Sequence, residues 1–460
     1  MLKYIQADCG SGKTRSLIEM TKRSNDKFII VQSTLQLIEQ TTKELGAIAN
    51  VITSTNHSNV INATIEFLMA PTHRVLVLSE KAFLGISDLS LLKDWKIFLD
   101  DVVNFHAYKV INTEKKYEVE NELFKDFEEV SSQYLTAKPV LEFSDDLLKQ
   151  MSSSFDFVGT YDHFVMNSSF FDKIGKAGIV DVYSNDCKQL TTLAWVNIAK
   201  YKDLDVTFMS NLFEETLIYK GNKELFEKVD LEGLRERVKP VRERLKVYYF
   251  SEKQRLTRSF RDSQGDKLQA VYDYINTTVK EPYFYTTNTS TGKVLNGVHI
   301  KPVSRGMNSF QDYSNCVWLA SMKPSPVEAK QLELMFKITG EEITYARELE
   351  NLYQFCNRSS LRKYESTEQV VVYVFDKEQA QFLSDDIEYI DVGIDTDVVK
   401  FVPLDLGSTK TKRLYRTLKK NLSEDDFLVW LRSDTNKDLS DRERDYFSIQ
   451  YYKKMSKSPS

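Results

Sequence analysis

Short apolar runs alternate with amphipathic stretches over the first hundred residues of the chain. The apolar runs, each suited to a buried strand, lie at residues 2–7, 28–32, 51–53, 74–78 and 97–99. Between them apolar residues recur at helical spacing, as in the pattern from about Leu35 to Leu45. Buried strands that alternate with helices are typical of a parallel sheet covered on both faces. The pattern therefore predicts an α/β domain.

A second run of the same kind is predicted downstream. Helical patterns occur near residues 266–279, 327–337 and 345–356, and strand patterns at 282–286, 298–303, 316–320 and 369–375. A chain of 460 residues also exceeds what one hydrophobic core usually organises. We therefore predict two tandem parallel-sheet α/β domains, the first spanning residues 1–230 and the second residues 248–400.

Three further segments fall outside these two patterns. Residues 112–200 start with a charged helical sequence at 114–130 and are predicted to form an insertion in the first domain. Residues 231–247 are rich in Arg and Lys, and we expect them to form a basic linker between the domains. Residues 401–460 are predicted to form a small C-terminal extension that contains a basic helix near 410–420.

The composition narrows the class of protein. Hydrophobic residues make up 42% of the chain and charged residues 28%, as in ordinary globular proteins. The net charge of −5 argues against a wholly basic nucleic-acid binder, but it allows a protein with a positive groove. No apolar stretch approaches the ~20 residues of a membrane span, so we expect a soluble, cytoplasmic protein without a membrane partner.

The cysteines give no sign of a metal or disulfide framework. Cys9, Cys187, Cys316 and Cys356 lie far apart, and no CxxC pair or histidine at ligand spacing accompanies them. A zinc site is therefore not expected, and the cysteine usage fits a reducing compartment.

Residues 7–14, ADCGSGKT, have the composition of a phosphate-binding loop. An apolar strand precedes them and a helix follows, which disfavours the alternative of a chance surface loop. Glycines permit backbone torsions that aim N–H groups at a phosphate, and the helix N-terminus adds its dipole. We expect the loop to bind ATP through Gly10, Ser11, Gly12, Lys13 and Thr14. Lys13 would reach the β- and γ-phosphates, and Thr14 would offer its hydroxyl to Mg²⁺.

A pair of acids ends the strand predicted at residues 97–99. A phosphate-binding loop needs a second ligand for the metal and a group that orients the attacking water. Asp100 is placed to bind Mg²⁺ with Thr14, and Asp101 to position or deprotonate the water. The alternative is a solvated acidic strand end, and the nearby phosphate loop favours the functional interpretation.

Taken in order along the chain, these and other segments resemble the motifs of the superfamily-2 helicases and translocases. Residues 7–14 resemble motif I, with Ala7 in place of the usual Gly. Residues 31–41 resemble motif Ia, residues 78–83 resemble motif Ib, and residues 99–102 resemble the acidic box. Residues 207–213 resemble motif III, of which only Ser210 is retained. Residues 285–288 are similar to motif IV, and 304–321 are similar to motif V, with Gly306 and Asn308 at its Gly and Asp positions.

Motif VI contributes most to this resemblance. Residues 354–362 resemble the Gln-x-x-Gly-Arg pattern, whose arginines cross the cleft to the γ-phosphate. Arg358 aligns with the invariant arginine of that motif, and Arg362 comes one residue later than the second arginine of the common form.

The resemblance implies two RecA-like domains that hydrolyse ATP with Mg²⁺ and move on or unwind a nucleic acid. It implies catalytic roles for Lys13, Asp100, Asp101, Gln354, Arg358 and Arg362, and nucleotide binding by Gly306 as well as by the loop. The nucleic acid would contact the loops after the strands, at Ser33, Thr34, Ser79, Ser304 and Arg305. The basic stretches 235–246 and 410–420 either extend that groove or are solvated helix faces.

The compact build and divergent acidic box are similar to those of a phage or viral member acting in replication or recombination. DNA is favoured over RNA as the partner, and replication or recombination proteins are further candidate partners. Two alternatives remain. One is a packaging-type motor ATPase, and the other is a nucleic-acid scaffold that binds nucleotide with little turnover, because Asp101 replaces the Glu expected in the acidic box.

Overall fold

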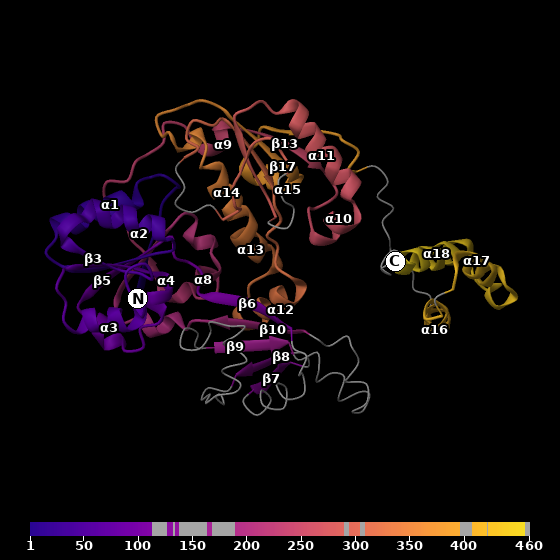
Figure 1. The fold of residues 1–460 in the computed structure, drawn as a ribbon, viewed down its shortest axis with the longest axis horizontal. Helices are drawn as coiled ribbons and strands as arrows, with labels where there is room; N and C mark the ends of the chain where they lie inside the picture. The colour runs from indigo at the N-terminus through magenta and orange to yellow at the C-terminus, as the bar shows by residue number, and fades with distance from the viewer. Residues whose placement is uncertain are drawn as a thin grey trace. The chain divides into compact units, whose positions relative to one another are not determined.

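The computed structural model describes residues 1–112, 127–131, 134–137, 163–167, 189–288, 294–303, 309–395, 407–420 and 422–455. The chain divides into two compact units, Met1–Asp395 and Thr396–Ser460. The first unit holds two parallel sheets with their helices, which we call the first lobe and the second lobe (Figure 1).

The first lobe is built on a seven-stranded parallel sheet. Its order is β12-β1-β11-β5-β2-β4-β3. The strands are β1 (Leu2–Gln6), β2 (Lys27–Gln32), β3 (Ala49–Ile52), β4 (Val75–Ser79), β5 (Trp95–Asp100), β11 (Asp205–Ser210) and β12 (Phe226–Lys228). The helices are α1 (Lys13–Arg23), α2 (Leu35–Leu45), α3 (Val60–Met69), α4 (Glu80–Leu84) and α8 (Leu217–Lys220). The wholly buried neighbours Ile29 and Ile30 of β2 belong to two different apolar clusters. Because successive side chains of a strand point to opposite faces, the sheet has a core on each side.

Helices α2 and α4 of the first lobe start close behind the strands that precede them, and polar residues cap both helices. The Thr34 hydroxyl accepts a hydrogen bond from Leu37 N at the start of α2, and the Ser79 hydroxyl accepts one from Ala82 N at the start of α4. Such caps satisfy backbone N–H groups that have no partner within the helix. They fix where the chain turns from strand to helix, at the edge of the sheet where ligands bind in this class of fold.

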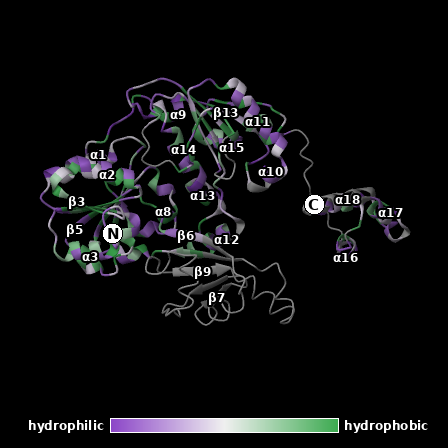
Figure 2. Ribbon diagram, in the orientation of Figure 1, coloured by the Kyte–Doolittle hydropathy of each residue, from purple (hydrophilic) through white to green (hydrophobic). Residues whose placement is uncertain are grey.

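The second lobe repeats this architecture with a six-stranded parallel sheet. Its order is β15-β14-β16-β17-β13-β18. The strands are β13 (Leu245–Ser251), β14 (Tyr283–Thr287), β15 (Val298–His299), β16 (Asn315–Leu319), β17 (Val370–Asp376) and β18 (Ile387–Tyr389). The helices are α9 (Val241–Arg244), α10 (Arg258–Ser263), α11 (Gly265–Thr278), α12 (Pro326–Phe336), α13 (Gly340–Thr344), α14 (Glu350–Cys356) and α15 (Lys377–Leu383). A π-helical turn, Tyr345–Leu349, joins α13 to α14. Figure 2 shows hydrophobic strands between helices of mixed hydropathy, as expected for sheets covered on both faces.

The predicted fold class of two tandem α/β domains is confirmed by these two sheets. Two local expectations were inaccurate. Residues 241–247, expected in a linker, form α9 and the start of β13, because apolar Val241, Leu245 and Val247 are buried among the charged residues. The strand expected at 298–303 is limited to Val298–His299.

A five-stranded antiparallel sheet takes four of its strands from residues 112–200, the region expected to be an insertion, and its strand β6 from the residues directly before that region. Its order is β6-β10-β9-β8-β7, from strands β6 (His106–Asn112), β7 (Phe127–Ser131), β8 (Tyr134–Ala137), β9 (His163–Asn167) and β10 (Gln189–Trp195). The helical interpretation of 114–130 is wrong for residues 127–130, where pairing with β8 overrides helix propensity; residues 114–126 lie outside the described residues. Helix α12 of the second lobe packs on this sheet, and Ser325 Oγ donates to Tyr108 Oη at 2.9 Å.

The second unit has its own small core. Its helices are α16 (Gly407–Leu418), α17 (Glu424–Arg432) and α18 (Asp441–Met455). Leu414, Phe427 and Phe447 are buried together between them. The helix expected near 410–420 is α16. In the described parts of both units, every helix is too short or too polar to cross a bilayer.

Candidate functional site

A cavity of about 290 Å³ is walled by both lobes of the first unit. The first lobe contributes the glycine-rich loop and the end of β5, and the second lobe contributes the region that begins at α14. Its lining includes Gly10, Gly12, Lys13, Thr14, Asp100, Asp101, Gln354, Arg358 and Arg362. All six residues expected to be catalytic therefore surround one cavity, although they come from distant parts of the sequence.

The loop between β1 and α1 needs glycine at two positions. Gly10 has φ 80° and Gly12 has φ 96°, a left-handed conformation that side chains disfavour. A Cβ atom on Gly10 would lie 3.2 Å from Cγ of Arg362 and 3.3 Å from Cε2 of Tyr364. Glycine at position 10 thus allows the second lobe to approach the loop closely.

Lys13 opens α1 and is largely buried, with 8% of its surface exposed. Its Nζ donates to the carbonyl oxygen of Ala7 at 2.8 Å and to that of Asp8 at 3.2 Å. The ammonium group therefore lies across the mouth of the loop, where it can exchange a carbonyl partner for a phosphate oxygen.

Thr14 and Asp100 meet beside the loop. Thr14 Oγ1 donates to Asp100 Oδ2 at 2.7 Å, and Gln32 Nε2 donates to the same oxygen at 3.0 Å. Gln32 also donates to Thr41 Oγ1 at 2.9 Å. Gln32 was not among the expected site residues. Its register opposite Asp100 in the β2–β5 pair explains its role, and the only sequence sign was a polar residue that ends an apolar strand.

The two acids at the end of β5 differ in environment. Asp100 is 2% exposed, and burial, followed by the nearby charge of Asp101, raises its pKa to about 6. Asp101 is only partly buried and has φ 55°, a left-handed conformation that few residues other than glycine adopt. Its N–H donates to Met209 O at 2.9 Å. This sharp turn aims Asp101 away from the line of the strand and into the cavity wall.

The second lobe brings positive charge to the cavity. Arg358 is 6% exposed, and the pKa of Arg362 is lowered first by burial and then by the charge of Arg358. Gln354, one turn before Arg358, donates to Glu350 Oε1 within α14. Two guanidinium groups that repel each other in a buried wall favour an anionic ligand between them and the loop.

The residues expected to contact nucleic acid lie elsewhere. Ser33 and Thr34 follow β2, and Ser79 is the last residue of β4. All three are outside the lining of this cavity, and the hydroxyls of Thr34 and Ser79 cap helices. Ser304, Arg305 and Gly306 lie outside the described residues, so their expected roles stay predictions.

Two residues of the basic stretch 235–246 are engaged within the second lobe. Arg244 is fully buried and donates to the carbonyl oxygens of Ser360, Lys363 and Glu368. Lys246 pairs with Asp386 and Glu388. Arg244 and Lys246 thus have structural partners within the second lobe.

Comparison with known proteins adds little beyond the general architecture. No protein-family model matches the chain, and no curated protein matches its sequence. A solved structure titled XPD_Helicase is 12% identical, with 85% of this chain and 96% of that chain covered and a TM-score of 0.47. Xpd4 of S. tokodaii is 11% identical, with 85% and 96% covered and a TM-score of 0.49. S. cerevisiae Dbp5, bound to RNA and ADP BeF3, is 11% identical, with 85% of each chain covered and a TM-score of 0.40. We therefore rest the function on the cavity itself.

Proposed function

We propose that the protein is an ATP-driven nucleic-acid helicase or translocase, in which nucleotide hydrolysis opens and closes two RecA-like lobes. The observation that supports this proposal is that Lys13 of the first lobe and Arg358 of the second line the same cavity. A triphosphate held by both would favour a closed arrangement of the lobes. Loss of the γ-phosphate removes the shared ligand, so the closed state loses its advantage.

The residues present fit a Mg²⁺ ion bound with the nucleotide. Thr14 Oγ1 and Asp100 Oδ2 are hard oxygen ligands 2.7 Å apart, and the buried Gln32 Oε1 has no hydrogen-bond partner in the described parts of the chain. In the described parts of the chain, no group of three or more His, Cys, Asp or Glu side chains could hold a metal ion. This suits Mg²⁺, which commonly uses one or two protein ligands with phosphate oxygens and water. When bound, it would neutralise charge on the β- and γ-phosphates.

The other site residues have complementary roles in the proposed reaction. Lys13 would bind the β- and γ-phosphates, while Asp101 orients the attacking water on the open side of the γ-phosphate. Arg358 and Arg362 would stabilise the charge that develops on the transferred group, an effect of about 10³–10⁵ in rate when an arginine acts across an interface in other enzymes. Gln354 would help to position the water or the γ-phosphate from α14.

We further propose that a nucleic-acid strand crosses the ends of the parallel strands at Ser33, Thr34 and Ser79, with Ser304 and Arg305 on the other lobe. Hydroxyl and backbone donors favour sequence-independent contacts with phosphates. DNA as the preferred strand, the replication or recombination role and a phage or viral origin stay predictions. So do the domain limits of 1–230 and 248–400, although residues 241–247 of the linker predicted at 231–247 form α9 and the start of β13.

One observation favours the scaffold alternative. Asp101 has a side chain one methylene shorter than the expected Glu, and it lies at a left-handed turn. That geometry is compatible with slow water activation. The packaging alternative predicts a nuclease domain with clustered acids after the ATPase, and it has less support because two acids of residues 376–405 have structural partners. Asp385 pairs with Arg242, and Asp395 accepts hydrogen bonds from Ser251 Oγ and Glu252 N.

Phosphate release from ATP, measured with and without single- and double-stranded DNA and RNA, tests the proposal. We expect strand-stimulated release that falls at least about 100-fold in Lys13→Ala, because a preorganised charge at the phosphates is removed. The matched control is Lys22→Ala, at the exposed end of the same helix, which should retain full activity. Wild-type protein that binds ATP without releasing phosphate would instead identify the scaffold.

A further inference from the structure

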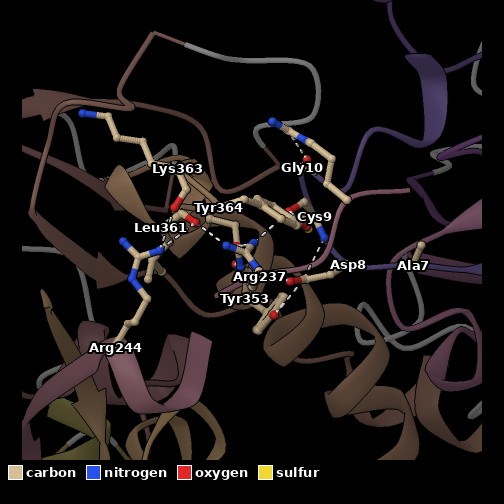
Figure 3. Close-up of polar contacts among 12 residues, drawn as sticks. Ala7, Asp8, Cys9, Gly10, Arg237, Arg244, Tyr353, Leu361, Lys363 and Tyr364 are labelled. Carbon is tan, nitrogen blue, oxygen red and sulfur yellow. Dashed lines mark hydrogen bonds and ion pairs between the residues drawn. The ribbon is translucent and has the colours of Figure 1, made fainter. Parts of the chain in front are cut away.

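A second set of polar contacts lies behind the glycine-rich loop, outside the expected site residues. Its members, which we call the loop clamp, are Asp8, Arg235, Arg237, Tyr353 and Tyr364. Figure 3 labels all of them except Arg235. They come from three places: the loop itself, the segment before α9, and the region of α14 and the residues after it. The loop clamp therefore connects the phosphate-binding loop with the segment that carries Arg358.

The carboxylate of Asp8 is held by side chains from α14 and from the segment before α9. Tyr353 Oη donates to Asp8 Oδ1 at 2.8 Å, and Arg237 Nε forms an ion pair with Asp8 Oδ2. Within the loop, Cys9 N also donates to Asp8 Oδ1 at 2.7 Å. The Arg237 side chain is only 7% exposed, so solvent screens this ion pair little.

The same residues bind the carbonyl oxygens of the loop. The carbonyl of Cys9 accepts from Arg237 Nη2 at 2.9 Å and from Tyr364 Oη at 3.0 Å. The carbonyl of Gly10 accepts from Arg235 Nη2 at 2.6 Å, and that of Ser11 accepts from Arg235 N at 2.8 Å. A carbonyl held by these donors cannot turn its negative oxygen towards a bound phosphate. The contacts thus favour the loop conformation that presents N–H groups.

Arg237 continues from the loop to the arginine-bearing segment. Its Nη2 donates to Asn357 Oδ1 at 2.8 Å, its Nη1 donates to Leu361 O, and its guanidinium carbon lies 4.0 Å from the centroid of the Tyr364 ring. Asn357 precedes Arg358 in the chain, just as Tyr353 precedes Gln354. Tyr353, Asn357 and Leu361 therefore each lie one residue before a side chain that lines the cavity.

We propose that Arg237 and Tyr353, acting through Asp8, are positioning residues for ATP hydrolysis. They hold the loop and the Arg358 segment in the register that the transition state requires, and this inference rests on the proposed function. Charged groups stabilise a transition state only when they are held close to their working geometry, and displacement by about 1 Å can cost as much as 10²-fold in rate. ADP contacts the loop but lacks the γ-phosphate that Arg358 would reach, so its affinity should depend much less on the register.

The experiment compares ADP with ADP–beryllium fluoride, a mimic of the bound triphosphate, in binding titrations of the full chain. Tyr353→Phe removes one hydroxyl and keeps the ring. We expect it to weaken binding of the fluoride complex and to lower kcat by about tenfold, with ADP affinity changed less than about twofold. Arg237→Gln should act in the same direction and more strongly, and Arg237→Lys should recover part of the loss. Arg242→Gln is the matched control, because that exposed arginine pairs with Asp385 away from the loop.

A double-mutant cycle identifies the clamp as one unit. If Tyr353 acts through Asp8, then Asp8→Asn combined with Tyr353→Phe should lower kcat little more than Asp8→Asn alone. The inference is overturned if the variants unfold at a lower temperature but keep kcat within about twofold of wild type, with the ratio of the affinities for ADP and ADP–beryllium fluoride also unchanged within about twofold. The contacts would then stabilise the fold without positioning the site. Failure of the proposed function would give a different result, because the wild-type protein would then show no hydrolysis stimulated by nucleic acid. The ratio of the affinities for ADP and ADP–beryllium fluoride would still test the clamp.

Discussion

Asp100 is a carboxyl group that the fold buries beside Asp101, and its pKa is raised to about 6 by burial and by that neighbouring charge. The ordinary pKa, taken for the unfolded chain, is 3.8. Between these two values the folded state binds more protons than the unfolded state. The contribution of Asp100 to the free energy of unfolding therefore falls as the pH rises from about 4 to about 6, and stays constant above that range.

Asp100→Asn should remove the destabilisation that the buried Asp100 carboxylate causes once it is ionised. We expect the variant to be more stable than wild type at about pH 7, by on the order of 1–3 kcal/mol, and to show little of that gain at about pH 4. Urea unfolding of the nucleotide-free protein at the two pH values measures the difference. Asp94→Asn, at an exposed position just before the same strand, is the control. An equal effect of Asp100→Asn at both pH values would contradict the assigned protonation.

Sequence patterns identified residues whose chemistry is local and missed those whose role depends on a distant partner. Lys13 and Thr14 belong to a glycine-rich loop whose local sequence alone predicts phosphate binding. Gln32, by contrast, becomes a site residue only because β2 lies next to β5 in the sheet. Arg237 was expected in a basic stretch, and its contacts with the loop depend on how the lobes meet.

At the scale of elements, predictions succeeded where an apolar pattern agreed with a capping residue. Helix α2 has the predicted limits of Leu35 and Leu45, with Thr34 as its cap. Predictions failed where charge concealed burial, as in β13, or where strand pairing opposed the local pattern, as in β7. The order of strands within each sheet could not be predicted, because it depends on crossovers that local patterns do not encode.

The pairing of β14 with β15 depends on a close approach at Gly297. A Cβ atom on Gly297 would lie 2.5 Å from Cε2 of Tyr283 and 2.6 Å from its carbonyl oxygen, and Tyr283 is buried. Gly297→Ala should therefore destabilise the protein by about 1–3 kcal/mol, through overpacking against a side chain and backbone that cannot yield. Thermal unfolding measures the change. Gly340→Ala, at a helix start with nothing within 4 Å, should be neutral or slightly stabilising.

At the scale of the whole molecule, the proposed machinery is contained in one unit. Both parallel sheets and every residue that lines the cavity lie within Met1–Asp395, and the second unit has a core of its own. A chain ending at residue 400 is therefore expected to keep strand-independent ATP hydrolysis within about threefold of the full chain. ATPase and thermal unfolding measurements on the two chains test this. A folded but inactive short chain would show that residues 401–460 take part in the reaction.

Under the proposed function, a cavity wall shared between two lobes links nucleotide binding thermodynamically to lobe closure. Linkage is reciprocal: the factor by which a second ligand changes the affinity for ATP is also the factor by which ATP changes the affinity for that ligand. A nucleic-acid strand that binds the open form more tightly must lower the affinity for ATP, and ATP must lower the affinity for that strand by the same factor. The affinity of either ligand, measured as a function of the other, therefore gives the free energy that one binding event transmits to the other.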